Sequence, residues 1–226
     1  MSAIAMTAAK RVFLIHATRI AIEPINAAFA QGWPEAKRFD LWDDSLSKDA
    51  GTAGGSTPAL DQRIQDLADH AFRSEADAVL FTCSAFSSAI EACQRRHQRP
   101  VLKPNEAMVQ EALAIGGRIA ALTTFGPAGA AIVSDFEREA SRRGQAADIT
   151  PILCEGALEA LHAGDQARHD ALIAATAERL RGDYDMLCFA QFSMTAAQSA
   201  SEAAWGGSVL TTPTSAVRRL RQLLEG

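Results

Sequence analysis

A single thiol stands where the sequence predicts a strand turning into a helix. Cys83 lies between Thr82 and Ser84, directly after the apolar run Ala78-Val79-Leu80-Phe81. The partial positive charge at a helix N-terminus favours the thiolate form of a nearby cysteine. The free N–H groups of the same turn, with the hydroxyls of Ser84 and Ser87, could receive a carboxylate. We therefore interpret Cys83 as a functional thiol, with an inert buried cysteine as the alternative.

The chain contains an internal repeat, and the thiol is missing from its second copy. Residues 77–83 align with residues 185–191 at an offset of 108, and nearer the N-terminus the offset is 107. Repeats of this kind set the architecture. Under the alignment Cys83 faces Gln191, whose carboxamide cannot exchange a proton at neutral pH.

Other polar residues also follow predicted strands. His16 ends the first strand and is either a satisfied surface or interface residue or part of a site. Its repeat partner is Thr123, which precedes Thr124, and Ser193 follows Gln191. Asp43 and Asp44 are interpreted as a solvated loop pair, and Cys93, Cys154 and Cys188 as structural.

The elements that must position these residues are parallel α/β units. Short apolar runs alternate with helical patterns, and runs without polar alternation indicate strands that are covered on both faces. The predicted strands are 12–16, 39–42, 78–82 and 101–103 in the first half, and 119–123, 149–153, 186–190 and 209–211 in the second. We expect two lobes related by a pseudo-twofold, with strand ends that face each other across a cleft, because ligands bind beyond the carboxyl ends of such strands.

Helix signals separate the strands. Thr57 and Asp165 are predicted N-caps, and Asn105 is predicted to cap the helix that stops at Gly116-Gly117. Pro127 opens a helix that Gly144 ends. The Gly-rich segment 50–56 is predicted to be a surface loop or a lid over the site.

Composition excludes several classes of protein. The net charge of −5 argues against a nucleic-acid surface. No apolar stretch is long enough for a membrane span, and residues 1–10 lack the apolar region of a secretory leader. The four cysteines show no metal spacing and no sign of an oxidising compartment, so we expect a cytoplasmic protein. A dinucleotide enzyme is disfavoured because no G-x-G-x-x-G follows the first strand.

Several of these pieces together resemble the aspartate/glutamate racemase superfamily, which includes hydantoin racemases, maleate isomerases and arylmalonate decarboxylases. The resemblance rests on Thr82-Cys83-Ser84, on Thr123-Thr124, on the run 187–194 (Leu-X-X-Ala-Gln-Phe-Ser-Met) and on the duplication. It implies two Rossmann-like lobes, 1–102 with 206–226 and 103–205, with the active site between them and neither cofactor nor metal. It is also compatible with a homodimer.

Racemases of that family use two cysteines on opposite faces of the substrate, and this chain matches only the first. The resemblance therefore implies an enzyme that transfers a proton next to a carboxylate of a small acid or amino acid. Its acid/base or nucleophile would be Cys83, with His16 as a second proton donor. The substrate oxygens would be bound by Thr82, Ser84, Thr123, Thr124, Gln191 and Ser193. The resemblance implies a racemase or isomerase, with a decarboxylase as the close alternative. A single thiol suits a decarboxylase or an isomerase that uses covalent addition, and a racemase would need His16 or another group in place of the missing thiol. The other alternative is an inactive small-acid-binding or regulatory protein.

Overall fold

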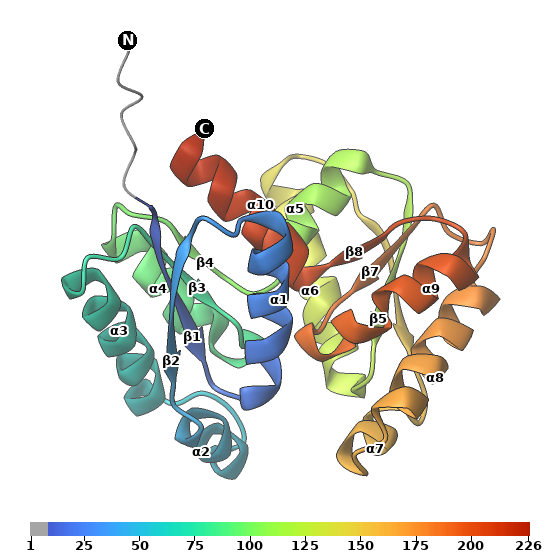
Figure 1. The fold of residues 1–226 in the computed structure, drawn as a ribbon, viewed down its shortest axis with the longest axis horizontal. Helices are drawn as coiled ribbons and strands as arrows, with labels where there is room; N and C mark the ends of the chain where they lie inside the picture. Colours follow the sequence, from blue (N-terminus) through green and yellow to red (C-terminus); the bar gives the residue numbers. More distant parts are fainter. Residues whose placement is uncertain (1–8) are drawn as a thin grey trace. The chain divides into compact units, whose positions relative to one another are not determined.

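A computed structural model describes residues 9–226 of the chain (Figure 1). The expected absence of a secretory leader concerns mainly residues 1–8, which lie outside the described part. None of the helices in residues 9–226 is long and apolar enough to cross a membrane.

Two four-stranded parallel sheets form the framework, and they contain all eight predicted strands. The first has the order β2-β1-β3-β4 and the second β6-β5-β7-β8. The strands are β1 (Arg11–His16), β2 (Lys37–Trp42), β3 (Ala78–Phe81), β4 (Val101–Leu102), β5 (Arg118–Thr123), β6 (Asp148–Leu153), β7 (Met186–Phe189) and β8 (Val209–Thr211). The predicted α/β fold class is confirmed.

The duplication is visible in the pairing of the strands. In the first sheet Val12 pairs with Ala78, and in the second Ile119 pairs with Met186. The first residues of the central strands β1 and β5 make the same kind of hydrogen bond, from a backbone N–H to an aspartate carboxylate. The backbone N–H of Arg11 donates to Asp77 Oδ2 at 2.7 Å, and that of Arg118 donates to Asp185 Oδ2 at 2.8 Å.

Helices connect the strands in both halves. They are α1 (Ile22–Gly32), α2 (Ser45–Ala53), α3 (Pro58–Arg73), α4 (Ser87–Arg96), α5 (Glu106–Ile115), α6 (Gly126–Arg142), α7 (Ala157–His162), α8 (Gln166–Arg179), α9 (Gln198–Trp205) and α10 (Thr212–Glu225). Short 3₁₀ helices add η1 (Arg19–Ala21), η2 (Ser84–Phe86) and η3 (Phe192–Ala197). Both η2 and η3 follow the third strand of their half, where the candidate site residues stand.

Contacts divide the chain into two compact units. Among residues 9–226, one comprises residues 9–22, Asn26–Lys103 and Val217–Gly226, and the other Glu23–Ile25 and Pro104–Ala216. Within the second unit β8 pairs with β7. The segment after Gly206 therefore completes the second sheet before the chain returns to the first unit at Val217. The expected lobes, 1–102 with 206–226 and 103–205, stay a prediction.

The predicted helix caps are present with one exception. Thr57 Oγ1 accepts the Leu60 N–H at 3.3 Å, and Asp165 Oδ1 accepts the Arg168 N–H at 3.0 Å. Gly144, at φ 67°, follows α6 in the left-handed conformation. Asn105 occupies the cap position of α5, but its side chain accepts no cap hydrogen bond, and its amide instead lies 3.4 Å from Asp135. The predicted role of the Asn105 side chain was wrong.

The Gly-rich segment 50–56 is only partly a loop. Helix α2 extends through Ala53, because Leu46 and Ala50 are buried and hold it against the core of the first unit. Gly54, at φ 73°, then ends the helix. The prediction of a loop was wrong for residues 50–53, and the lid over the site stays a prediction.

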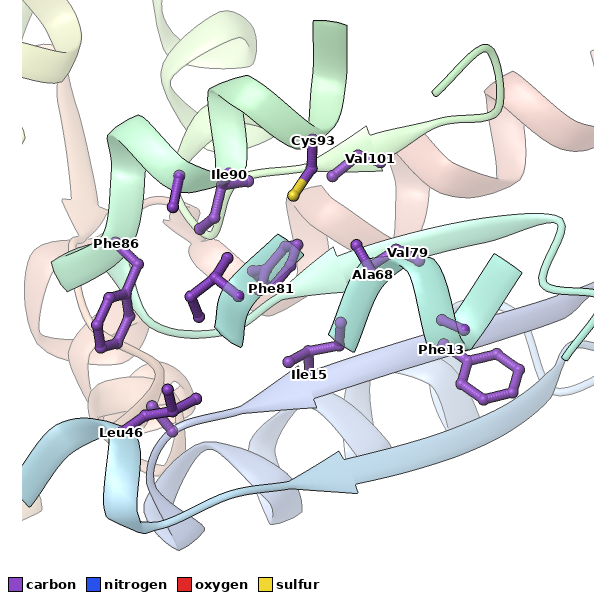
Figure 2. Close-up of a cluster of buried hydrophobic side chains, with 14 of the residues drawn as sticks. Phe13, Ile15, Leu46, Ala68, Val79, Phe81, Phe86, Ile90, Cys93 and Val101 are labelled. Carbon is purple, nitrogen blue, oxygen red and sulfur yellow. The ribbon is translucent and has the colours of Figure 1, made fainter. Parts of the chain in front are cut away.

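Side chains alternate between the two faces of each sheet, and buried side chains lie on both faces. In the first sheet Phe13, Ile15 and Phe81 belong to one buried cluster with Ala68 of α3 and with Ile90 and Cys93 of α4 (Figure 2). His16 and Thr82 are each one residue further along, so they belong to the opposite face. In the second unit Ala121 and Cys188 pack on one face of the sheet and Leu122 and Phe189 on the other, in two separate clusters.

Candidate functional site

The first unit brings His16 and Thr82 together at neighbouring strand ends. Ile15 pairs with Phe81 in the sheet, so the next residue on each strand is also adjacent. His16 Nδ1 lies 2.9 Å from Thr82 Oγ1, and both side chains are buried. Thr82 Oγ1 also lies 3.4 Å from the carbonyl oxygen of Ile15.

The other ring nitrogen of His16 contacts Asp40 on β2. Nε2 lies 3.0 Å from Asp40 Oδ1, and the Asp40 side chain is 39% exposed. Burial lowers the pKa of His16 below its ordinary value, although the Asp40 carboxylate opposes that change. Asp40 was not among the residues predicted for the site. Only the sheet register, which no local sequence pattern reveals, places Asp40 opposite Leu14 and therefore on the same face as His16.

Cys83 follows Thr82, and its surroundings favour the thiol form rather than the expected thiolate. It stands at the N-cap of η2, is half-buried, and is hydrogen-bonded by the backbone N–H of Ala85. Burial raises its pKa above the ordinary thiol value, and the Ala85 hydrogen bond offsets this only in part. The expectation of a depressed pKa was wrong because burial of the sulfur outweighs any effect of the helix end. The helix that directly follows Cys83 is also only η2, which is three residues long, while α4 begins at Ser87. So short a helix carries little dipole.

Ser84 and Ser87 follow Cys83 in the same turn. Ser84 is exposed, and its carbonyl oxygen accepts the hydroxyl of Ser87 at 2.9 Å. The Ser87 proton is therefore occupied within the turn. Ser84 remains next to Cys83, where its hydroxyl is open to solvent.

In the second unit Thr124 and Gln191 form a tight contact. Gln191 Oε1 accepts the backbone N–H of Thr124 at 2.6 Å and its hydroxyl at 3.1 Å. These two donors fix the orientation of the carboxamide, so that its NH₂ group points away from Thr124. Thr123 ends β5 and is 1% exposed, and Ser193 is half-buried in η3.

The remaining predicted residues have structural surroundings. Asp43 accepts Ser45 Oγ and Arg63 at 2.6 Å each, so it is more firmly held than a solvated loop residue. Cys93, Cys154 and Cys188 are buried, and burial raises the pKa of Cys93 and of Cys154 to about 11. Among residues 9–226, no group of three or more His, Cys, Asp or Glu side chains is placed to hold a metal ion.

The fold is shared with known enzymes. An aspartate racemase homologue from Pyrococcus horikoshii OT3 superposes with a TM-score of 0.73 at 13% identity, covering 96% of this chain and 100% of its own. Allantoin racemase from Klebsiella pneumoniae gives a TM-score of 0.72 at 14% identity, covering 96% and 88%. The Gly74Cys mutant of arylmalonate decarboxylase gives 0.65 at 16% identity, covering 96% and 94%.

Sequence comparison gives the family directly. No curated protein matches the chain at a significant level. The model of the Asp/Glu/hydantoin racemase family matches residues 13–220, which include both sheets except the first two residues of β1. The chain therefore belongs to the Asp/Glu/hydantoin racemase family.

Proposed function

We propose that this protein is a cofactor-independent enzyme that transfers a proton at the carbon next to a carboxylate of a small acid, with Cys83 as its single active-site thiol. The observation that carries this proposal is the contrast between the two strand ends. One copy places a half-buried thiol after its third strand, and the other places an amide there. An enzyme with this arrangement has one proton-transferring group of this kind.

The state of Cys83 favours a proton donor. A thiol with a raised pKa stays protonated at neutral pH, so it begins the reaction with a proton to give. A base that removes a proton would need the thiolate instead. Donation to one face of a planar carbanion is the step that such a group performs best.

The second unit supplies hydrogen-bond donors rather than a second base. The N–H and hydroxyl of Thr124 already converge on one oxygen, that of Gln191, at 2.6 and 3.1 Å. A carboxylate or enediolate oxygen could take the place of the amide oxygen and receive the same two donors. Thr123, Ser193, Ser84 and Thr82 are further candidates for contacts with substrate oxygens.

These roles favour a decarboxylation over a racemisation. The bond between the central carbon and one carboxylate breaks, CO₂ leaves, and its bonding electrons pass into the remaining carboxylate to give an enediolate. The Cys83 S–H then protonates the carbon, and water returns a proton to the thiolate. A racemase would require a second group on the opposite face, a role for which His16 is the candidate.

The test is turnover by wild type, Cys83→Ala and the matched control Cys93→Ala, which removes a buried core thiol. Substituted malonates and single enantiomers of aspartate, glutamate and allantoin are incubated in D₂O and followed by NMR and polarimetry. We expect decarboxylation with one deuterium at the central carbon in wild type and Cys93→Ala, and none in Cys83→Ala. Racemisation that depends on Cys83 would support the family's other reaction instead.

Two outcomes count against the proposal. Turnover that survives in Cys83→Ala would remove the thiol from the mechanism. Binding of these acids without turnover would identify a small-acid-binding protein of the same fold.

A further inference from the structure

Asp40, His16 and Thr82 form a hydrogen-bonded line in which His16 and Thr82 are buried, and the number of protons in the line decides which atoms donate. The Asp40 carboxylate can only accept, so the proton of a neutral imidazole must sit on Nε2, which lies 3.0 Å from Asp40. Nδ1 is then an acceptor, and Thr82, 2.9 Å away, must donate its hydroxyl proton to it. Thr82 has only one such proton. In this state its oxygen offers only lone pairs to a ligand.

Protonation of His16 reverses the direction of the second hydrogen bond. Imidazolium donates from both nitrogens, so Nδ1–H would donate to Thr82 Oγ1 and release the threonine proton. The remaining acceptor for that proton is the Ile15 carbonyl oxygen at 3.4 Å, which is a long hydrogen bond. A ligand carboxylate next to Thr82 would be a better acceptor, because hydrogen bonds to charged groups are stronger.

We propose that a substrate carboxylate receives the hydroxyl proton of Thr82 only when His16 is protonated, so that binding of the acid draws a proton onto His16. Asp40 and His16 are then positioning residues that act through Thr82. This inference rests on the proposed function, since it assumes that a small carboxylate binds beside Cys83. It also gives His16 a different role from the second proton donor predicted from the sequence.

Among residues 9–226, Asp40 is the charged group that contacts the His16 ring. Asp43, whose backbone N–H donates to the His16 carbonyl at 3.0 Å, has its carboxylate bound to Ser45 and Arg63. Arg38, on the same face of β2 as Asp40, donates to the Asn26 carbonyl oxygen at 3.0 Å. Arg19 of η1 and Glu23, the one charged residue of α1, are exposed, and burial raises the pKa of Cys83 on the β3 side, which favours its neutral form.

Burial supports the same state of the free protein, since it lowers the pKa of His16 and keeps the ring neutral near pH 7. The negative charge of a bound carboxylate would raise the pKa of His16 again. Binding and proton uptake are then linked, and affinity is greatest at low pH.

The test is calorimetric titration of malonate into the full chain, in buffers of different ionisation enthalpy, from about pH 7 to about pH 8.5, where malonate itself stays fully ionised. We expect uptake of about one proton per malonate and affinity that falls about tenfold per pH unit. The ¹⁵N spectrum of the His16 ring should change from the Nε2–H tautomer to imidazolium when malonate binds. Cys83→Ala should keep this slope, which separates His16 from ionisation of the thiol.

Variants of Thr82 and Asp40 test whether these residues control proton uptake or only support the structure. Thr82→Val, which keeps the shape without the hydroxyl, should lose both affinity and slope, and Thr82→Ser should retain them. Asp40→Asn, at a side chain that is 39% exposed, should move the affinity profile to lower pH. Malonate affinity that does not change with pH, or a slope that persists in Thr82→Val, would overturn the inference and leave the proposed function intact. Failure of malonate and the other acids to bind at any pH would overturn both.

Discussion

Replacing Gln191 by methionine tests whether its carboxamide holds the strand end of the second unit. The substitution keeps the length of the side chain and removes the oxygen that accepts two hydrogen bonds, from the Thr124 N–H at 2.6 Å and the Thr124 hydroxyl at 3.1 Å. Each such bond contributes about 1 kcal/mol, and a buried donor left without a partner costs about 1 to 3 kcal/mol. Because Gln191 is half-buried and water can reach part of it, we expect a loss of about 2 kcal/mol in the free energy of unfolding.

The assay is urea unfolding followed by circular dichroism, with Gln222→Met on the exposed face of α10 as the matched control. A double-mutant cycle with Thr124→Val isolates the contact, since valine keeps the backbone N–H but removes the hydroxyl. We expect Thr124→Val to lower the free energy of unfolding less than Gln191→Met does. The double variant should lose less stability than the sum of the two single losses. A Gln191→Met variant as stable as the Gln222→Met control would refute this account of the contact.

Three further predictions follow from single features. Because burial raises the pKa of Cys83, its alkylation by iodoacetamide, followed by peptide mass spectrometry, should reach half its maximal rate at a higher pH than free cysteine does; a lower midpoint would contradict the assigned burial. The pKa of His16 is lowered in the folded protein, so the unfolded chain binds a proton more readily as the pH drops below about 6.5. Stability, measured by denaturant midpoints, should therefore fall over that range in wild type and fall less in His16→Asn. Thr57→Ala should cost about 1 kcal/mol of stability by removing the cap of α3, and Thr57→Ser should not; equal losses would exclude the cap as the cause.

The buried strands of both sheets could be predicted from the sequence alone, because burial on both faces requires a run of apolar residues. Strands covered on both faces must be apolar throughout, so 78–81 and 186–189 are recognisable without any contact being known. The internal repeat then fixes which strand of one half corresponds to which of the other. The caps at Thr57 and Asp165 are equally local, since each is set by a hydroxyl or carboxylate and the N–H groups three residues ahead.

The details of the candidate site depend on contacts between distant residues, and sequence could not supply them. His16 finds Asp40 and Thr82 only through the sheet register, at separations of 24 and 66 residues. The length of α2 depends on Leu46 and Ala50 meeting the core, which outweighs the weak helix propensity of Gly51. The pKa of Cys83 was predicted with the wrong sign, because a strand-to-helix turn indicates a helix dipole but not how deeply the sulfur is buried.

At the position after the third strand, the two copies have a similar backbone conformation and differ in the side chain. Cys83 (φ −124°, ψ 125°) and Gln191 (φ −137°, ψ 141°) both stand at the N-cap of a 3₁₀ helix after a buried four-residue strand. The short cysteine side chain remains within its own turn, on the Ala85 N–H, whereas the longer glutamine reaches the neighbouring strand end and satisfies Thr124. A thiol at position 191 would be too short to reach Thr124 in the same way, so Gln191→Cys would leave the Thr124 N–H without its acceptor. Restoring the symmetry of the repeat would therefore lower the stability of the second unit, unless a bound carboxylate supplied the missing oxygen.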